Sequence, residues 1–173
     1  DAEICVKVPA GTPVGSQPTK ARSNNYDSNT MAFTVQSTIP NDPTVTEPPS
    51  RQWNAAETLA IAVGGVTSSS TIVLKTDISV GPSSNLRLQI EVQPTGTDFT
   101  CVASTTPIGS GGCAAYSGGA GALEGTVAGG GGCDSCTSLS QAEISFTGLT
   151  DGTKHWQARV RNASTGEYSN WVS

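Results

Sequence analysis

The sequence NLRLQIEV, residues 85–92, alternates apolar and polar side chains without interruption. Leucine, isoleucine and valine occupy every second position, and the residues between them are Arg87, Gln89 and Glu91. Successive side chains of a β-strand point to opposite faces of its sheet. The stretch therefore predicts a strand with one face in a core and with Arg87, Gln89 and Glu91 turned outward to water.

The same period of two recurs along the chain, in residues 72–80, 142–146 and 154–161. In residues 154–161 the pattern turns Trp156, Ala158 and Val160 inward. The polar positions predicted to face outward are His155, Gln157, Arg159 and Arg161. Turn-forming sequences at 81–84 and 151–152 separate these segments. Consecutive strands of this kind predict antiparallel sheets with one wet face, and two such sheets packed together make a β-sandwich.

Composition agrees with an all-β fold. Hydrophobic residues make up 35% of the 173 positions and charged residues only 13%, and the rest is rich in Ser, Thr, Gly and Pro. Helices favour Ala, Leu, Glu and Lys instead. Lys and Arg are scattered through a chain of net charge −5, so no nucleic-acid partner is expected. No run of about 20 apolar residues predicts a membrane-spanning helix.

A proline-rich segment divides the chain. Residues 37–50, STIPNDPTVTEPPS, hold four prolines in a polar run, which is typical of an extended interdomain linker. Before it, residues 1–36 contain two predicted strands, at 2–8 and 31–35. After it, residues 51–173 contain the alternating strands, with a Gly-rich insertion at 101–140.

Five cysteines indicate an oxidising compartment, so we expect an extracellular or cell-surface protein. Cys101, Cys113, Cys133 and Cys136 are predicted to form two disulfides that close the insertion, with the pairing left open. Cys5 is then the odd cysteine, a candidate for an unpaired or intermolecular thiol.

Other interpretations of the insertion are weaker. The sequence CDSC at 133–136 has the spacing of a redox motif but lacks a βαβ context, and a four-cysteine zinc site is the alternative to disulfides. Residues 109–132 lack the Lys-Ser/Thr of a phosphate-binding loop and are expected to form a surface loop. The sequence therefore predicts no metal and no cofactor.

No catalytic residue is predicted either. His155 is the only histidine, so histidine-dependent nucleophilic catalysis would need it, and the strand pattern turns it outward. Nothing in the sequence indicates that any two of the dispersed acids converge as a catalytic pair. These acids are Asp98, Glu124, Asp134 and Glu143.

Two kinds of surface contact remain. Trp53 and Trp171 are candidates for stacking on a sugar ligand, because Trp156 belongs to the core by periodicity. Asn162 begins the sequon Asn-Ala-Ser and is a candidate glycosylation site on a surface turn.

Residues 148–161, GLTDGTKHWQARVR, and 168–173, YSNWVS, resemble the last strands of a fibronectin type III-like domain of bacterial and archaeal surface proteins. Upstream, residues 62–67, 71–79 and 85–99 are similar to the early strands of that family. The resemblance covers residues 51–173 and implies an antiparallel immunoglobulin/fibronectin III-like β-sandwich. The chain departs from the family in the length of its 101–140 insertion, and Ser173 falls inside the expected final strand.

Residues 6–15, VKVPAGTPVG, with 27–29 and 33–35 resemble the closing part of an immunoglobulin-like IPT/TIG domain. The resemblance implies that the first strands of that domain come from preceding sequence or from a neighbouring subunit. An incomplete sandwich would otherwise expose unpaired strand edges.

These features predict a non-catalytic structural module of an extracellular assembly, either a filament subunit or a segment of a surface stalk. Its expected partners are further copies of the chain or neighbouring domains of the same protein. The alternative is an accessory carbohydrate-binding or adhesion module of a secreted enzyme, with a glycan as partner.

Overall fold

The computed structural model describes residues 13, 15–19, 22–23, 26–27, 31–35, 40–43, 51–79, 84–101, 113–136 and 140–173. The chain divides into two compact units, residues 1–37 and 38–173. All regular elements in the described ranges are β-strands, and the strands pair antiparallel. The predicted all-β antiparallel fold class is confirmed.

The first unit contains two strand pairs. β1 (Gly15–Thr19) pairs with β4 (Met31–Val35), and β2 (Arg22–Ser23) pairs with β3 (Tyr26–Asp27). The strand predicted at 31–35 is thus present as β4, whereas the strand predicted at 2–8 lies outside the described residues.

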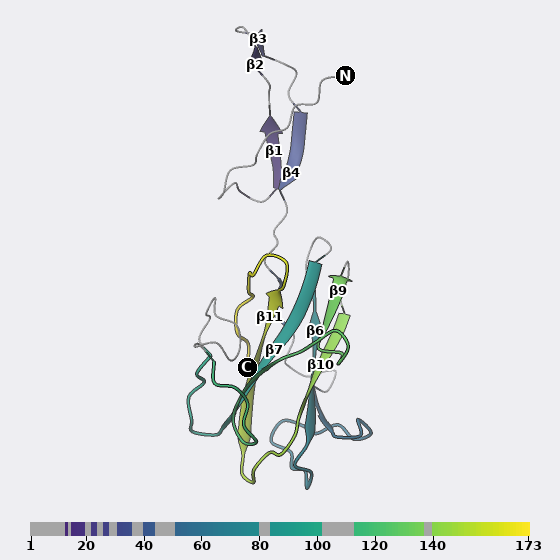
Figure 1. Cartoon of the computed structure of the whole chain (residues 1–173), viewed down its shortest axis with the longest axis vertical. Coiled ribbons are helices and arrows are strands. Elements are labelled where there is room, and N and C mark those ends of the chain that lie inside the picture. The colour runs from purple at the N-terminus through teal and green to yellow at the C-terminus, as the bar shows by residue number, and fades with distance from the viewer. Residues whose placement is uncertain are drawn as a thin grey trace. The chain divides into compact units, whose positions relative to one another are not determined.

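The second unit consists of two sheets. One has the order β10-β6-β5, and the other has the order β11-β7-β8, with β9 also pairing with β7. β7 therefore lies between β11 on one side and β8 and β9 on the other. Figure 1 shows β7 with β11 and β9. The bounds are β5 Gln52–Asn54, β6 Ile72–Ile78, β7 Ser84–Pro94, β8 Gly121–Glu124, β9 Gly132–Cys136, β10 Ser140–Phe146 and β11 Lys154–Asn162.

One hydrophobic core joins the two sheets, as a sandwich requires. The alternating apolar positions of β6, β7, β10 and β11 all contribute to it, and Trp156 packs against it as the sequence predicts. Its fully buried members include Leu74, Leu88, Phe146 and Val160, each at 0% exposure.

The Gly-rich insertion supplies strands, although a surface loop was expected there. β8 and β9 pair with successive parts of the same edge of β7. Leu88 lies between these two parts and bonds to both ends of the segment that joins β8 to β9. The Gly125 N–H donates to the Leu88 carbonyl at 2.8 Å, and the Leu88 N–H donates to the Gly131 carbonyl at 2.9 Å. A Cβ on either glycine would collide with the backbone of the other, so this close approach requires glycine.

The prediction that the second sheet has a wet outer face is wrong. Gln89, Glu91 and Arg159 are fully buried and Gln157 is 8% exposed, although all four were expected to face water. The cover comes from segments far away in the sequence. Residues near Cys101 bond to Glu91, and the C-terminal segment stacks on Arg159.

The described part of the predicted linker belongs to the second unit. The Asn41 N–H donates to the Ser79 carbonyl at 3.0 Å, and the Asp42 carboxylate accepts the Asn170 N–H at 2.8 Å. Residues 40–43 therefore lie against the sandwich as an attached segment.

We predict that Gly131→Ala destabilises the chain by about 1–3 kcal/mol, since the new methyl group would overlap the Gly125 backbone. Urea unfolding followed by circular dichroism measures the change. Gly129→Ala is the matched control, because its methyl would first meet the Thr126 hydroxyl at 3.1 Å. Equal stability of the two variants would contradict the assigned close approach.

Candidate functional site

The covered outer face of the β11-β7-β8 sheet holds a layer of polar side chains, which we call the polar layer: Gln89, Glu91, Gln93, Glu124, Gln157, Arg159 and Arg161. Register explains how it forms, because Gln157 lies opposite Glu91 and Arg159 lies opposite Gln89 on neighbouring strands. Polar residues at alternate positions of two paired strands necessarily share one face.

Glu91 is the best satisfied member of the layer. Its carboxylate accepts hydrogen bonds from Gln93 Nε2 and Gln157 Nε2, both at 2.8 Å. It also accepts the backbone N–H and the hydroxyl of Thr100 at 2.7 and 2.9 Å, and the N–H of Cys101 at 3.1 Å. Burial alone would raise the pKa of Glu91, but the bonds from Gln93, Thr100 and Gln157 outweigh it and hold the pKa below its ordinary value.

Arg159 lies between two aromatic rings. Its guanidinium carbon is 4.1 Å from the centre of the Tyr168 ring and 4.5 Å from that of Trp171, and its Nε donates to Gln89 Oε1 at 2.7 Å. Three buried nitrogen atoms have no hydrogen-bond partner within the part of the chain that the structure describes: Arg159 Nη1, Arg159 Nη2 and Trp171 Nε1. Burial, the largest influence, lowers the pKa of Arg159.

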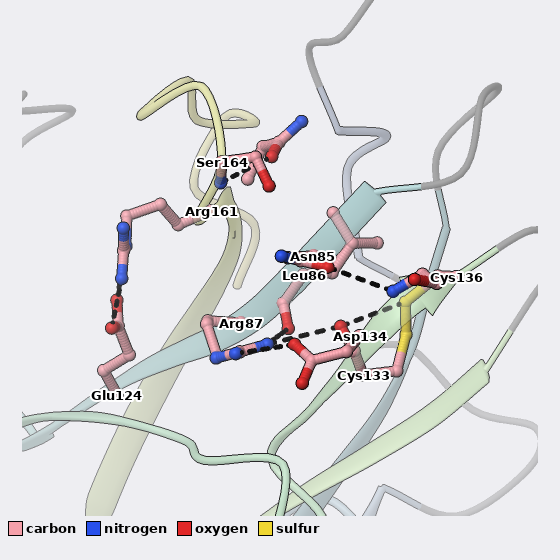
Figure 2. A network of polar contacts seen from close by, with 11 residues as sticks. Asn85, Leu86, Arg87, Glu124, Cys133, Asp134, Cys136, Arg161 and Ser164 are labelled. Atoms are coloured by element: carbon pink, nitrogen blue, oxygen red, sulfur yellow. Dashed lines mark hydrogen bonds and ion pairs between the residues drawn. A yellow bond between two sulfur atoms is a disulfide. The ribbon is translucent and has the colours of Figure 1, made fainter.

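Glu124 is the member of the polar layer that β8 contributes, and it bonds to members on β7 and β11. It receives Arg161 Nε at 2.7 Å and Arg161 Nη2 at 2.6 Å, as well as Gln89 Nε2 at 2.5 Å (Figure 2 draws the bonds to Arg161). Burial raises the pKa of Glu124, yet the bonds from Arg161 and Gln89 outweigh this and leave the pKa lowered. Such a two-pronged arginine–carboxylate pair fixes the geometry of both partners.

The four insertion cysteines form two disulfides, Cys101–Cys113 and Cys133–Cys136, as predicted. The first is buried, and it packs with Ala122 and against Trp171. A second small cluster of apolar groups thus lies on the covered face. Cys5 lies outside the described residues.

The second disulfide lies at one end of a polar network that also includes Arg87 (Figure 2). Arg87 Nη1 donates to the carbonyls of Leu86 and Cys133 at 2.8 and 3.2 Å, and Arg87 Nη2 donates to Asp134 Oδ1 at 2.9 Å. The Ser135 N–H donates to Asn85 Oδ1 at 3.0 Å. Side chains of β7 thereby hold residues 133–135 of β9 in place.

The histidine and the four acids considered as catalytic candidates lie in different surroundings. His155 Nε2 lies 2.9 Å from the Thr97 carbonyl, and its ring stacks on Phe99 at 4.2 Å between centres. Glu143 pairs with Lys75 at 3.1 Å. Asp98 is exposed, while Glu124 and Asp134 pair with the arginines described above. Among the described residues, no group of three His, Cys, Asp or Glu side chains is placed to hold a metal ion.

The two candidate tryptophans differ in surroundings. Trp171 gives one ring face to Arg159 and packs on the Cys101–Cys113 cluster, so its ring is largely committed to internal contacts. Trp53 is half-buried in β5, with the Lys75 ammonium 5.5 Å from its ring centre.

Asn162 is 1% exposed. Its Oδ1 accepts the backbone N–H groups of Ser164 and Thr165 at 3.0 and 3.4 Å and so shapes the turn after β11. Attachment of a glycan would therefore require this turn to open.

The loop between β5 and β6 exposes three large apolar side chains, Leu59, Val63 and Val66, at 65%, 78% and 96%. Leu59 and Val66 belong to the lining of a hollow of about 390 Å³, which is formed by residues 59–62 and 65–69 together with Asn54. Sequence periodicity gave no indication of this surface. No helix in the described ranges is long and apolar enough to span a membrane.

No protein-family model matches this chain, and a search of curated proteins gives no match. The fibronectin type III-like and IPT/TIG-like resemblances therefore remain predictions.

Stability should depend on pH through Glu91. Because its folded-state pKa is depressed, its contribution is fully present above the unfolded value of about 4.3–4.5 and is lost as the pH falls through the lower folded pKa. The Glu91→Gln variant should be less stable by about 2 kcal/mol at neutral pH and should lose less stability on acidification. Urea unfolding between neutral and acid pH measures both effects.

Asp98→Asn serves as the control for this experiment, since it also replaces one carboxylate by an amide but does so at an exposed position, where the change should cost little stability. Parallel pH profiles for the unmodified chain and Glu91→Gln would refute the assigned role of the carboxylate.

Proposed function

We propose that this chain is a non-catalytic structural module of an extracellular assembly, a filament subunit or a surface-stalk segment that pairs with a strand of a neighbouring copy. The observation that supports this proposal best is a stretch of the outer edge of β11 that has no backbone partner among the described residues. An unpaired strand edge is a template for another extended chain.

The C-terminal segment covers only part of that edge. The Ala158 and Val172 backbones exchange two hydrogen bonds of 2.8 Å, and the Ser169 N–H donates to the Val160 carbonyl at 2.9 Å. Outward-pointing backbone groups recur at every second residue of a strand. Those of Lys154 and Trp156 continue the same edge, and within the described residues neither has a backbone partner there.

Side-chain chemistry also favours a structural role. The polar layer uses its carboxylates and guanidinium groups in internal contacts, and His155 stacks on Phe99. Two disulfides close the insertion, which suits an oxidising environment. The supports for the proposal are thus a rigid scaffold and an edge able to accept a strand.

The exposed apolar loop provides a second surface for association. Scattered apolar residues on a surface are ordinary, but three large ones on one loop, two of which line a hollow, are typical of a contact site. Contacts at this loop and at the β11 edge together would give each subunit two different faces, as an open head-to-tail assembly needs.

We predict that Lys154→Pro abolishes polymer formation, because proline removes the outward N–H and obstructs an added strand. Lys154→Ala is the matched control, since both changes remove the contacts of the ammonium with Thr150 and Asp151. Negative-stain electron microscopy and sedimentation of the purified proteins should show polymers for the unmodified chain and Lys154→Ala only. Monomers at every concentration, or equal polymerisation of Lys154→Pro, would count against the proposal.

A further inference from the structure

The Cys133–Cys136 disulfide differs from Cys101–Cys113 in the size of its loop. Cys133 and Cys136 are three positions apart in the sequence, whereas Cys101 and Cys113 are twelve positions apart. A disulfide that closes a short loop removes less entropy from the unfolded chain, so it is held less firmly by folding. Ser135, inside the short loop, has a φ of 58°, a left-handed conformation that costs energy for a residue with a Cβ.

The four cysteine residues differ in exposure. Cys101 is fully buried, and Cys113 and Cys136 are each 5% exposed. Cys133 alone among the four is half-buried, and the neighbouring Asp134 and Ser135 are exposed. An attacking thiolate needs access to one sulfur of a bridge. Cys133 also packs against the hydrophobic core, but as the most exposed of the four cysteine residues it is the one that we expect solvent-borne thiols to reach first.

Side chains of β7 hold residues 133–135 through hydrogen bonds that do not involve the disulfide. Arg87 contacts the Cys133 carbonyl and the Asp134 carboxylate, while Asn85 holds the Ser135 N–H (Figure 2). These bonds join β7 to the turn through groups other than the sulfur atoms. Once the bridge opens, they keep the two cysteines close together, so the bridge can form again.

We propose that Cys133–Cys136 is a thiol–disulfide exchange site that accepts a small thiol on Cys133. The thiolate of the small molecule attacks Cys133 Sγ, a new S–S bond forms, and the old one breaks to leave Cys136 as a thiolate that takes up a proton. A second small thiol then attacks the sulfur of the first and releases Cys133. Two electrons and two protons pass to the protein, and the small thiols leave as their disulfide.

The test uses the folded full chain with Cys5→Ser, so that only the bridged cysteines remain. After incubation with glutathione, free thiols are alkylated and peptides are mapped by mass spectrometry. We expect a glutathione adduct on Cys133 and an alkylated Cys136, forming roughly tenfold or more faster than any modification of Cys101 or Cys113. Removal of free glutathione before alkylation should let the Cys136 thiolate displace glutathione from the Cys133 adduct and restore the bridge, whereas the fully reduced form should close on addition of glutathione disulfide.

Adducts on Cys136, equal rates at the two bridges, or reaction only in denaturant would overturn the proposal. Two single variants check which sulfur is accessible. Cys136→Ser should leave a Cys133 thiol that reacts readily, and Cys133→Ser should leave a Cys136 thiol that reacts slowly. This chemistry is independent of assembly, so its failure would not bear on the β11 edge.

Discussion

The guanidinium of Arg159 is buried on a sheet face that period-two alternation assigns to water, and closure of that face depends on how this charge is accommodated. Removing a cation from water is costly unless its surroundings replace the lost hydration. Gln89 supplies one hydrogen bond, and the rings of Tyr168 and Trp171 supply π-faces. Both rings belong to the C-terminal segment, so pairing of this segment with β11 and burial of the cation require each other.

Glu91 extends the same constraint to the insertion. Its carboxylate holds the backbone of Thr100 and Cys101, and the Cys101–Cys113 bridge packs against Trp171. The polar layer thus connects three stretches that are remote in sequence: β7, the start of the insertion and the C-terminal segment. Because each of these contacts joins segments that are far apart in the sequence, the polar layer restricts how the segments can be arranged around it.

Local sequence predicted the strands well, because β6, β7, β10 and β11 each alternate with a period of two. The same alternation misplaced Gln89, Glu91 and Arg159, since a period of two distinguishes faces without showing what covers them. The cover comes from Thr100–Cys101 and Trp171, which only tertiary structure brings to these strands. The number and spacing of the cysteines predicted two bridges, whereas the pairing and the unequal exposure of the cysteine residues depend on the fold.

The central claim is that the insertion and the C-terminal segment close the outer face of the sheet over Arg159 and Glu91. Native-state amide hydrogen exchange tests it most directly. The Val172 N–H, bonded to the Ala158 carbonyl, and the Cys101 N–H, bonded to Glu91, should exchange nearly as slowly as that of Ile90 in the core. Exchange of Val172 and Cys101 at the rate of an exposed turn amide such as that of Gly96 would contradict the account.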